Sequence, residues 1–213
     1  MPSEPTDETR GESTVGVDGP MGVGGASPGG QARLVRAVVA ITLVVLAVDQ
    51  LTKWRALARL VPGERIDLVG SLLGLELVFN PGAALSIATG MTWVLTVIAA
   101  LVVVVVARAS RRLGSRLWTL AFGLLLGGAL GNLVDRFFRP PAPARGHVVD
   151  FIAYGNWFVG NVADIAIVVA AALVVLQTLR GVRLDGTREP RRVDAEPAPA
   201  PDEGARPAEP GGR

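Results

Sequence analysis

The chain alternates long apolar runs with short polar segments, and four of the runs are long enough to cross a lipid bilayer. They cover about residues 34–54, 91–107, 117–134 and 162–179. A helix needs about 20 predominantly apolar residues to span the hydrocarbon core. The uncharged core of the first run extends only from Ala37 to Val48, so the run needs the segment Asp49–Lys53 as its last turn. We therefore predict four transmembrane helices, with Asp49 and Lys53 at a membrane interface.

The segment between the first two runs, residues 55–90, is too long for a plain connection. Residues 75–79 alternate between apolar and polar side chains, which is typical of a strand, and residues 66–69 provide a partner. Residues 70–74, with a glycine at each end, provide a turn. The predicted fold class is therefore a membrane all-α protein with a small β element, in which four transmembrane helices carry a small outer-face sheet between helices 1 and 2.

The distribution of positive charge predicts the orientation of these helices. Cytoplasmic loops of membrane proteins carry an excess of lysine and arginine. Eleven such residues lie on the side of the two termini, namely Arg33, Arg36, Arg108, Arg111, Arg112, Arg116, Arg180, Arg183, Arg188, Arg191 and Arg192. Seven lie on the other side, namely Lys53, Arg55, Arg59, Arg65, Arg136, Arg139 and Arg145. We therefore expect both termini in the cytoplasm and the polar clusters at the outer face.

The two ends of the chain differ from the apolar middle. Residues 1–31 and 183–213 are rich in Gly, Pro, Ala, Glu and Arg without apolar periodicity, so we expect disordered cytoplasmic tails around a membrane domain at 32–182. A cleaved signal peptide is the alternative for the first run, because Ala56-Leu57-Ala58 has the small-x-small form. Lys53 and Arg55 lie between the run and that site, and the leader is long and acidic, which disfavours cleavage there.

Composition restricts the class of function. Half of the residues are hydrophobic and the mean hydropathy is +0.42, which indicates an integral membrane protein. The pI near 9.9 comes from arginines at the ends of apolar runs, and no basic patch interleaved with aromatics suggests nucleic-acid binding. The absence of cysteine excludes disulfides and thiol nucleophiles, and the single histidine, His147, excludes a multi-histidine metal site. We expect no metal and no cofactor.

Aspartates stand at the ends of the apolar runs, where an ionisable group is costly unless it meets a partner or water and is functional by default. Asp150 and Asp164 are 14 positions apart, enough for the chain to loop back and bring them together. Two neighbouring carboxylates share a proton, so one serves as a base for water and the other as an acid toward a carbonyl. Asn161 stands where an N-cap is expected, and Asp164 lies in the first turn of the last helix.

Five motifs occur in a fixed order along the four runs. They are Asp49-Gln50-Leu51-Thr52-Lys53, Asn80-x-Gly82-Ala83-Ala84-x-Ser86, the stretch 127–136 (GGALGNLVDR), Val148-Val149-Asp150-Phe151 and Asn161-Val162-Ala163-Asp164. In this order the chain resembles the lipoprotein signal peptidase family, also called signal peptidase II. The resemblance covers about residues 34–180.

This resemblance implies an aspartic endopeptidase of the bacterial plasma membrane that removes the signal peptide from prolipoproteins before a diacylglyceryl-modified cysteine. The implied partners are such prolipoproteins and membrane lipids, and we expect a monomer. By the family's motif, the catalytic dyad falls on Asp150 and Asp164. The residues implied to surround the dyad or hold the substrate are Asn80, Asn132, Arg136, Asn161, Asp49 and Lys53. Three departures from the family pattern are Gly160, Leu85 and a long proline-rich loop at 137–145.

Several of these polar residues also have a purely structural interpretation. Asp49 is the i, i+4 neighbour of Lys53 and is interpreted as its ion-pair partner. Asp135 beside Arg136 suggests an ion pair at a helix end, and His147 is expected in a solvent-facing loop.

Two asparagines and the glycines of the third run also allow a structural interpretation. Asn132 and Asn161 serve either as helix caps or in the site. The glycines of the third run suggest close helix contacts, at Gly123, Gly127, Gly128 and Gly131.

Rival classes of membrane protein fit the sequence less well. A small transporter would place its coupling carboxylate in the middle of a span. A rhomboid-type serine peptidase would need a Gly-x-Ser-Gly element and a histidine in a later span, and neither is present. A membrane phosphotransferase would need several aspartates on one helix to hold a metal, and no predicted helix has them.

Overall fold

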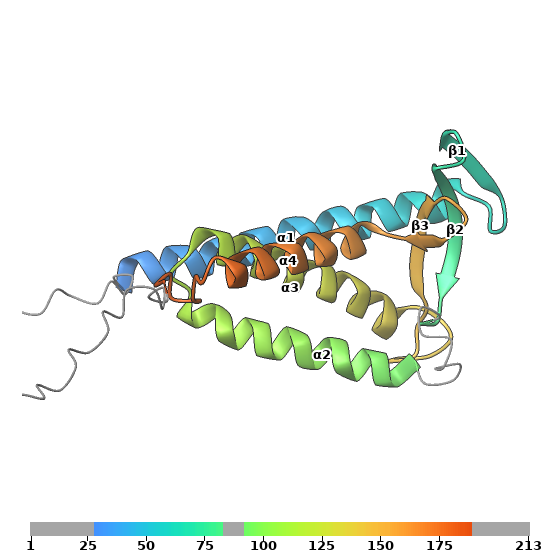
Figure 1. Cartoon of the computed structure of the whole chain (residues 1–213). Helices are drawn as coiled ribbons and strands as arrows, with labels where there is room; N and C mark the ends of the chain where they lie inside the picture. Colours follow the sequence, from blue (N-terminus) through green and yellow to red (C-terminus); the bar gives the residue numbers. More distant parts are fainter. Residues whose placement is uncertain (1–27, 83–91, 189–213) are drawn as a thin grey trace, which may run out of the picture.

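The computed structural model describes residues 28–82 and 92–188. Its elements are α1 (Pro28–Arg59), β1 (Arg65–Val69), β2 (Leu73–Asn80), α2 (Thr92–Ala109), the short 3-10 helix η2 (Ser110–Arg112), α3 (Arg116–Phe138), β3 (Val148–Tyr154), β4 (Phe158–Gly160) and α4 (Val162–Leu179). The helices α1 to α4 are long and apolar enough to cross a membrane, as predicted. They form an elongated bundle with the sheet at one end, which we call the sheet end (Figure 1).

The helix bounds extend beyond the predicted spans. Helix α1 begins at Pro28 rather than near residue 34, and α3 continues to Phe138 rather than ending near 134. The apolar pattern marks only the part of a helix that meets hydrocarbon. Backbone hydrogen bonding continues into the polar interface, where the next residues remain helical. Residues 28–31, predicted as disordered tail, are therefore part of α1.

The predicted C-terminal tail also begins with ordered structure. Residues 183–188 fold into a turn that is closed by a bridge between Val182 and Arg188. The backbone N–H of Gly114 donates to the carbonyl of Leu184 at 2.8 Å, and the Trp118 indole donates to the carbonyl of Val182 at 3.0 Å. The prediction of disorder was wrong for this segment, because tertiary contacts hold it. The remaining residues of both tails lie outside the described residues.

The sheet has four antiparallel strands in the order β1-β2-β3-β4. The predicted pairing of β1 with β2 is confirmed, with Ile66 opposite Leu75. The observed turn is shorter than the predicted one over residues 70–74, because β2 already begins at Leu73. The sheet is also not confined to the segment between α1 and α2, since β3 and β4 come from the segment between α3 and α4. Strand β3 pairs with β2 and places Asp150 opposite Val78.

Helix α3 is the central helix of the bundle. In its most apolar 18-residue stretch 56% is buried, against 17–22% in the corresponding stretches of the other three helices. Its glycines allow this, as the sequence predicted. A Cβ atom on Gly128 would lie 2.5 Å from the carbonyl oxygen of Ala163 in α4, and one on Gly131 would lie 2.5 Å from a carboxylate oxygen of Asp49 in α1. Small residues let helix backbones approach closely in membranes. The polar residues of α1, α3 and α4 therefore meet near the sheet end.

Candidate active site

Asp150 and Asp164 come together because the chain reverses between them. Asp150 lies in the middle of β3, and Asp164 lies in the first turn of α4. The hairpin of β3 and β4 returns the chain to the start of α4, with Ile152 paired to Gly160. The side chain of Asp150 accepts hydrogen bonds from the Asn161 amide at 2.6 Å and from the Asn80 amide at 2.8 Å.

Asp164 is partly exposed, whereas Asp150 is buried. One carboxylate oxygen of Asp164 accepts from the Asn132 amide at 3.0 Å, and the other accepts from the backbone N–H of Asn161 at 3.0 Å. The negative charges of Asp150 and Asp164 repel one another. Both carboxylates are therefore held by amide donors, without a direct ion pair to either among the described residues.

Asn161 joins the helix cap to the site. Its Oδ1 accepts from the backbone N–H of Asp164 at 3.0 Å, while the Asp164 carboxylate accepts from the Asn161 backbone, which completes a capping box. The Asn161 amide also donates to Oδ1 of Asn132 at 3.2 Å, besides its bond to Asp150. The predicted N-cap is confirmed, and the same side chain also contacts the carboxylate of Asp150.

Lys53 is completely buried, and its ammonium group contacts three oxygen atoms. It lies 2.9 Å from Asp49, 2.8 Å from Asp135 and 3.0 Å from Oδ1 of Asn132. The predicted i, i+4 pair of Asp49 and Lys53 is therefore present. Because Lys53 binds the Asn132 oxygen, the amide nitrogen of Asn132 must face the other way, where Asp164 accepts from it. A lysine in α1 thus orients a donor for a carboxylate in α4.

The predicted ion pair of Asp135 with Arg136 is absent. Asp135 instead pairs with Lys53 and, at 2.6 Å, with Nε of Arg139, and its carboxylate also accepts from the backbone N–H of Val149 at 3.1 Å. Residues i and i+1 point to different sides of a helix, whereas i and i+4 share a side. The spacing of Asp135 and Arg139 was the signal in the sequence that identified the correct partner.

Arg136 occupies a different place near the two carboxylates. It is buried, and its Nη1 has no hydrogen-bond partner among the described residues. Its charge interacts with Asp150, Asp135 and Asp164. Buried guanidinium nitrogens are almost always paired, so an unpartnered one beside two carboxylates is a feature that packing alone does not explain.

Burial raises the pKa of Asp150 to about 6. The hydrogen bond from Asn80 lowers this pKa, the charge of Asp164 raises it, and the hydrogen bond from Asn161 lowers it. Desolvation of the charged form is the largest of these effects. Asp150 therefore keeps its proton up to a higher pH than an ordinary aspartate.

The charges around the site balance when one proton is bound. Within the described residues, the cluster contains three basic side chains, Lys53, Arg136 and Arg139, and four carboxylates, Asp49, Asp135, Asp150 and Asp164. Buried charge is costly unless it is compensated. A single proton on the pair of Asp150 and Asp164 makes the whole cluster neutral.

All of the predicted site residues meet in this cluster. Asp49 also accepts from the backbone N–H of Ala163 at 3.0 Å, which fixes the start of α4 to α1. Sequence reasoning missed Gln50, whose amide donates to the carbonyl of Gly131 at 3.0 Å and to Asp49 at 3.1 Å. Its position beside Asp49 in the first motif was the available signal. The motif residues 83–86 lie outside the described residues.

The sequence profile of the family described as Signal peptidase (SPase) II matches residues 41–180. The chain belongs to the signal peptidase II family. It is 55% identical over 159 residues to the lipoprotein signal peptidase of Rhodococcus jostii, which covers 75% of this chain and 79% of that protein. It is 47% identical over 196 residues to that of Mycolicibacterium smegmatis, which covers 91% of this chain and 82% of that protein.

Two solved structures share the fold. Both are described as bacterial membrane enzymes, solved by the in meso method at 1.9 and 2.3 Å resolution. Their TM-scores are 0.59 and 0.60 at 24% identity, and they cover 67% and 72% of this chain and 92% and 94% of their own chains. The chain is therefore a multi-pass bacterial membrane peptidase, and the family to which it belongs removes signal peptides from prolipoproteins.

Proposed function

We propose that this chain is an aspartic endopeptidase that cuts prolipoproteins before the diacylglyceryl-modified cysteine, with Asp150 and Asp164 activating a water molecule. The observation that carries the proposal is the pair of carboxylates from β3 and α4, each held by asparagine amides inside a charge-compensated cluster. Two carboxylates that share one proton supply both the base and the acid for peptide hydrolysis.

The environments of the two carboxylates assign their roles. Asp164 accepts hydrogen bonds at the N-terminus of α4, where the helix dipole favours negative charge, so it is the base that takes a proton from water. Asp150, whose pKa is raised to about 6, is the acid that donates a proton to the carbonyl oxygen as the water oxygen bonds to the carbonyl carbon. Collapse of the resulting diol breaks the C–N bond, with a proton passing from Asp164 to the leaving nitrogen and one from the diol back to Asp150.

Arg136 supplies a fixed positive charge beside this reaction. Its unpartnered Nη1 donates to the carbonyl oxygen of the substrate, where negative charge develops in the transition state. Asp135 does not neutralise Arg136 through a direct ion pair, since its carboxylate is bound to Lys53 and Arg139. We therefore place Arg136 among the catalytic groups, and Lys53, Asp49 and Asp135 among the positioning residues.

An apolar pocket beside Asp164 supports a lipid-modified substrate. It has a volume of about 330 Å³ and is lined by Tyr154, Phe158, Asp164, Ile165, Val168 and Val169. Ile165, Val168 and Val169 are exposed on the membrane-spanning helix α4, so the pocket opens toward lipid. An acyl chain in this pocket anchors the substrate with its peptide at the dyad, and such positioning accounts for much of the rate enhancement in enzymes.

The departure at Gly160 shapes the same pocket. A Cβ atom at Gly160 would lie 2.5 Å from the ring of Phe158, so this ring occupies the space of the missing side chain. Phe158 stacks on Tyr154 with ring centroids 5.4 Å apart. Tyr154 and Phe158 together form one wall of the pocket.

The test is cleavage of a prolipoprotein by the purified full-length protein in detergent. We expect a lipid-modified precursor to be cut immediately before the modified cysteine, as read by gel shift and by mass of the released signal peptide. The same precursor without the diacylglyceryl group is expected to remain intact. Equal cleavage of both precursors contradicts the lipid requirement, and loss of activity in EDTA that zinc restores contradicts the aspartic mechanism.

A further inference from the structure

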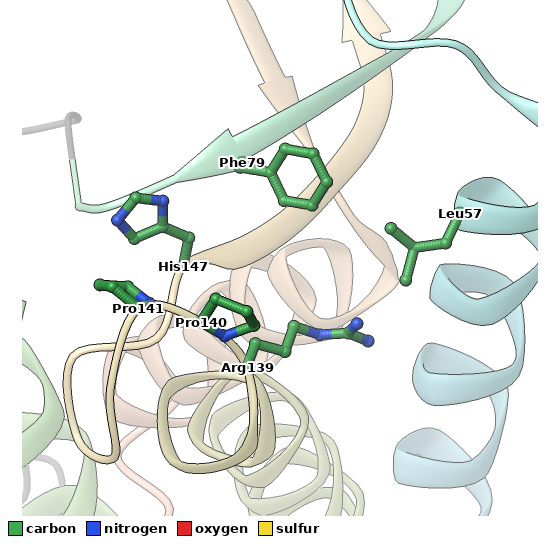
Figure 2. Close-up of a pocket in the computed structure, with 6 residues that line it drawn as sticks. All are labelled: Leu57, Phe79, Arg139, Pro140, Pro141 and His147. Carbon is green, nitrogen blue, oxygen red and sulfur yellow. The ribbon is translucent and has the colours of Figure 1, made fainter.

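A second cavity lies at the sheet end, apart from the dyad. It has a volume of about 510 Å³ and is lined by Leu57, Phe79, Arg139, Pro140, Pro141 and His147. Figure 2 shows the side chains of Leu57 and Phe79 facing each other across it, with the Arg139 guanidinium reaching toward Leu57. Phe79 is paired with Val149, one position away from Asp150 along β3. Because neighbouring strand residues point to opposite faces, this cavity and Asp150 lie on opposite sides of the sheet.

The cavity is built by a closed loop. In the loop 139–147, the backbone N–H of His147 donates to the carbonyl of Pro140 at 3.0 Å. The N–H of Gly146 donates back to the carbonyl of Arg136 in the last turn of α3 at 2.9 Å. Loops that are closed by their own backbone hydrogen bonds hold their walls in place. The proline-rich departure from the family pattern therefore forms a preformed pocket.

The walls of this cavity are apolar, but hydrogen-bond donors lie among them. Arg139 uses Nε for Asp135, and its two terminal nitrogens have no hydrogen-bond partner within the described part of the chain. Among the described residues, the only buried side-chain nitrogen without a hydrogen-bond partner is Nη1 of Arg136. The two terminal nitrogens of Arg139 also lack a partner, so they must be accessible to solvent. A planar guanidinium with free terminal donors is suited to a phosphate group.

The surrounding surface is basic. Residues 50–63 and 136–149 contain no acidic residue, whereas four of their basic side chains are exposed or half-buried, namely Arg55, Arg59, Arg139 and Arg145. The cavity also lies where α1 and α3 end. Exposed aromatic side chains near these two helix ends, Trp54 at 63% and Phe138 at 83%, are typical of the interface between a membrane and water.

We propose that this cavity binds an anionic phospholipid, with the phosphate on Arg139 and an acyl chain against Leu57 and Phe79. A phospholipid fits both features of the cavity, because the apolar walls suit a hydrocarbon chain and the terminal nitrogens of Arg139, whose Nε already pairs with Asp135, suit a phosphate group. A free phosphate leaves the walls uncovered. A lipid without a phosphate leaves these nitrogens without an acceptor, and a zwitterionic lipid brings a further positive charge to the basic surface. The cavity lies on the other side of the sheet from Asp150, and Arg139 connects it to the polar cluster through its ion pair with Asp135.

The experiment compares lipid retention by the full-length protein in detergent, read by native mass spectrometry with phosphatidylglycerol, phosphatidylcholine or glycerol phosphate as the probe. We expect phosphatidylglycerol to be retained and the other two probes to be released. Leu57→Trp and Phe79→Trp fill the cavity from opposite sides and are expected to weaken retention about tenfold. Leu68→Trp on the exposed strand β1 is the matched control, with retention unchanged.

Each variant is first checked for its thermal unfolding midpoint without lipid, so that only folded protein is compared. Equal retention of phosphatidylcholine, or retention that both tryptophan variants leave unchanged, overturns the proposal. Binding of glycerol phosphate as tight as that of phosphatidylglycerol overturns the lipid assignment. The cavity belongs to the substrate instead if both variants change only the KM for precursors that have acidic residues after the cysteine. That outcome also overturns the proposal of a lipid site.

Discussion

Three asparagines orient the hydrogen-bond donors of the proposed dyad. In each one, Oδ1 accepts from a lysine or from a backbone N–H, so the amide nitrogen must face a carboxylate. They are Asn80, Asn132 and Asn161. Neutral donors favour the ionised carboxylate more weakly than a lysine would, so the shared proton can move between the two acids. The only lysine of the site stays one residue away from the dyad, behind Asn132.

Replacing either dyad residue with asparagine separates chemistry from structure. Asp150→Asn and Asp164→Asn keep shape and hydrogen bonding but remove proton transfer. We expect turnover to fall by about 10²–10⁴-fold or more, while the protein still inserts and binds the precursor. Cleavage of a lipid-modified precursor, normalised to folded protein, is the measurement.

Asp49→Asn is the matched control for the dyad variants, because it is isosteric and buried in the same cluster. It removes one partner of Lys53, and removal of one partner from a buried ion pair costs roughly 3–5 kcal/mol. We expect lower thermal stability but measurable cleavage. If Asp135→Asn folds stably but does not cleave the precursor, while Asp150→Asn cleaves it near the wild-type rate, the dyad is assigned wrongly.

The raised pKa of Asp150 predicts a pH dependence. The proposed mechanism needs this carboxyl protonated, and its pKa of about 6 means that the protonated fraction falls as pH rises through about 6. We therefore expect kcat/KM to decline above that pH, by about tenfold per pH unit once ionisation is nearly complete. A profile of kcat/KM against pH in the free enzyme is the measurement.

Asn80→Ala tests the origin of that decline. The Asn80 amide lowers the pKa of Asp150 by binding its ionised form, so its removal raises the pKa. The declining limb is expected to move to higher pH, even if the maximum rate falls. A limb that stays in place or moves to lower pH contradicts the role of Asp150 as the acid.

At the scale of elements, the apolar pattern predicted the four helices, because each must cover its backbone polar groups and present apolar side chains to lipid. The N-cap at Asn161 was also predictable, since capping depends on residues three positions apart. The strands β3 and β4 were not predicted. Their pairing with β2 is a contact between distant segments, and residues 148–160 carry no clear alternation of their own.

Contacts between polar residues of the site were predictable only where the two residues belong to the same helix. The spacing of Asp49 and Lys53 identified that pair, while the contact of Lys53 with Asp135 joins α1 to α3 and has no local signal. The capping box of α4 gave the position of Asp164, but the amide of Asn132 that holds it comes from another helix. The two motifs of the dyad were therefore found from the sequence, and the supporting contacts came from the packing.

Gly131 tests how closely α1 and α3 must approach. A Cβ there would lie 2.5 Å from the Asp49 carboxylate, which is held by Lys53 and the backbone of α4. Gly131→Ala is expected to cost about 1–3 kcal/mol through overpacking and to lower kcat by displacing Lys53 and Asn132. Gly29→Ala in α1 is the control, because its Cβ meets nothing within 4 Å. Equal stability of the two variants in thermal unfolding contradicts this account.

On the scale of the whole molecule, the sheet lies at one end of the bundle, while the start of α1 and the end of α4 lie at the other (Figure 1). The helices bring the polar groups together, and the sheet places Asp150 against them. Under the proposed function, the peptide bond of a membrane-anchored precursor meets Asp150 and Asp164 at the sheet end of the bundle. This arrangement requires the sheet end to face the compartment in which the precursor's mature part lies.

The orientation can be measured directly, because the chain contains no cysteine. The excess of arginine on the side of the termini predicts that the sheet end faces outward and that both termini are cytoplasmic. Glu64→Cys lies on the exposed sheet end, and Arg111→Cys lies on the exposed opposite end. A membrane-impermeant maleimide is expected to label Glu64→Cys in intact cells and Arg111→Cys only after the membrane is broken. Labelling in the reverse order would place the dyad in the cytoplasm and contradict cleavage of translocated prolipoproteins, since their cysteine would then be on the other side of the membrane.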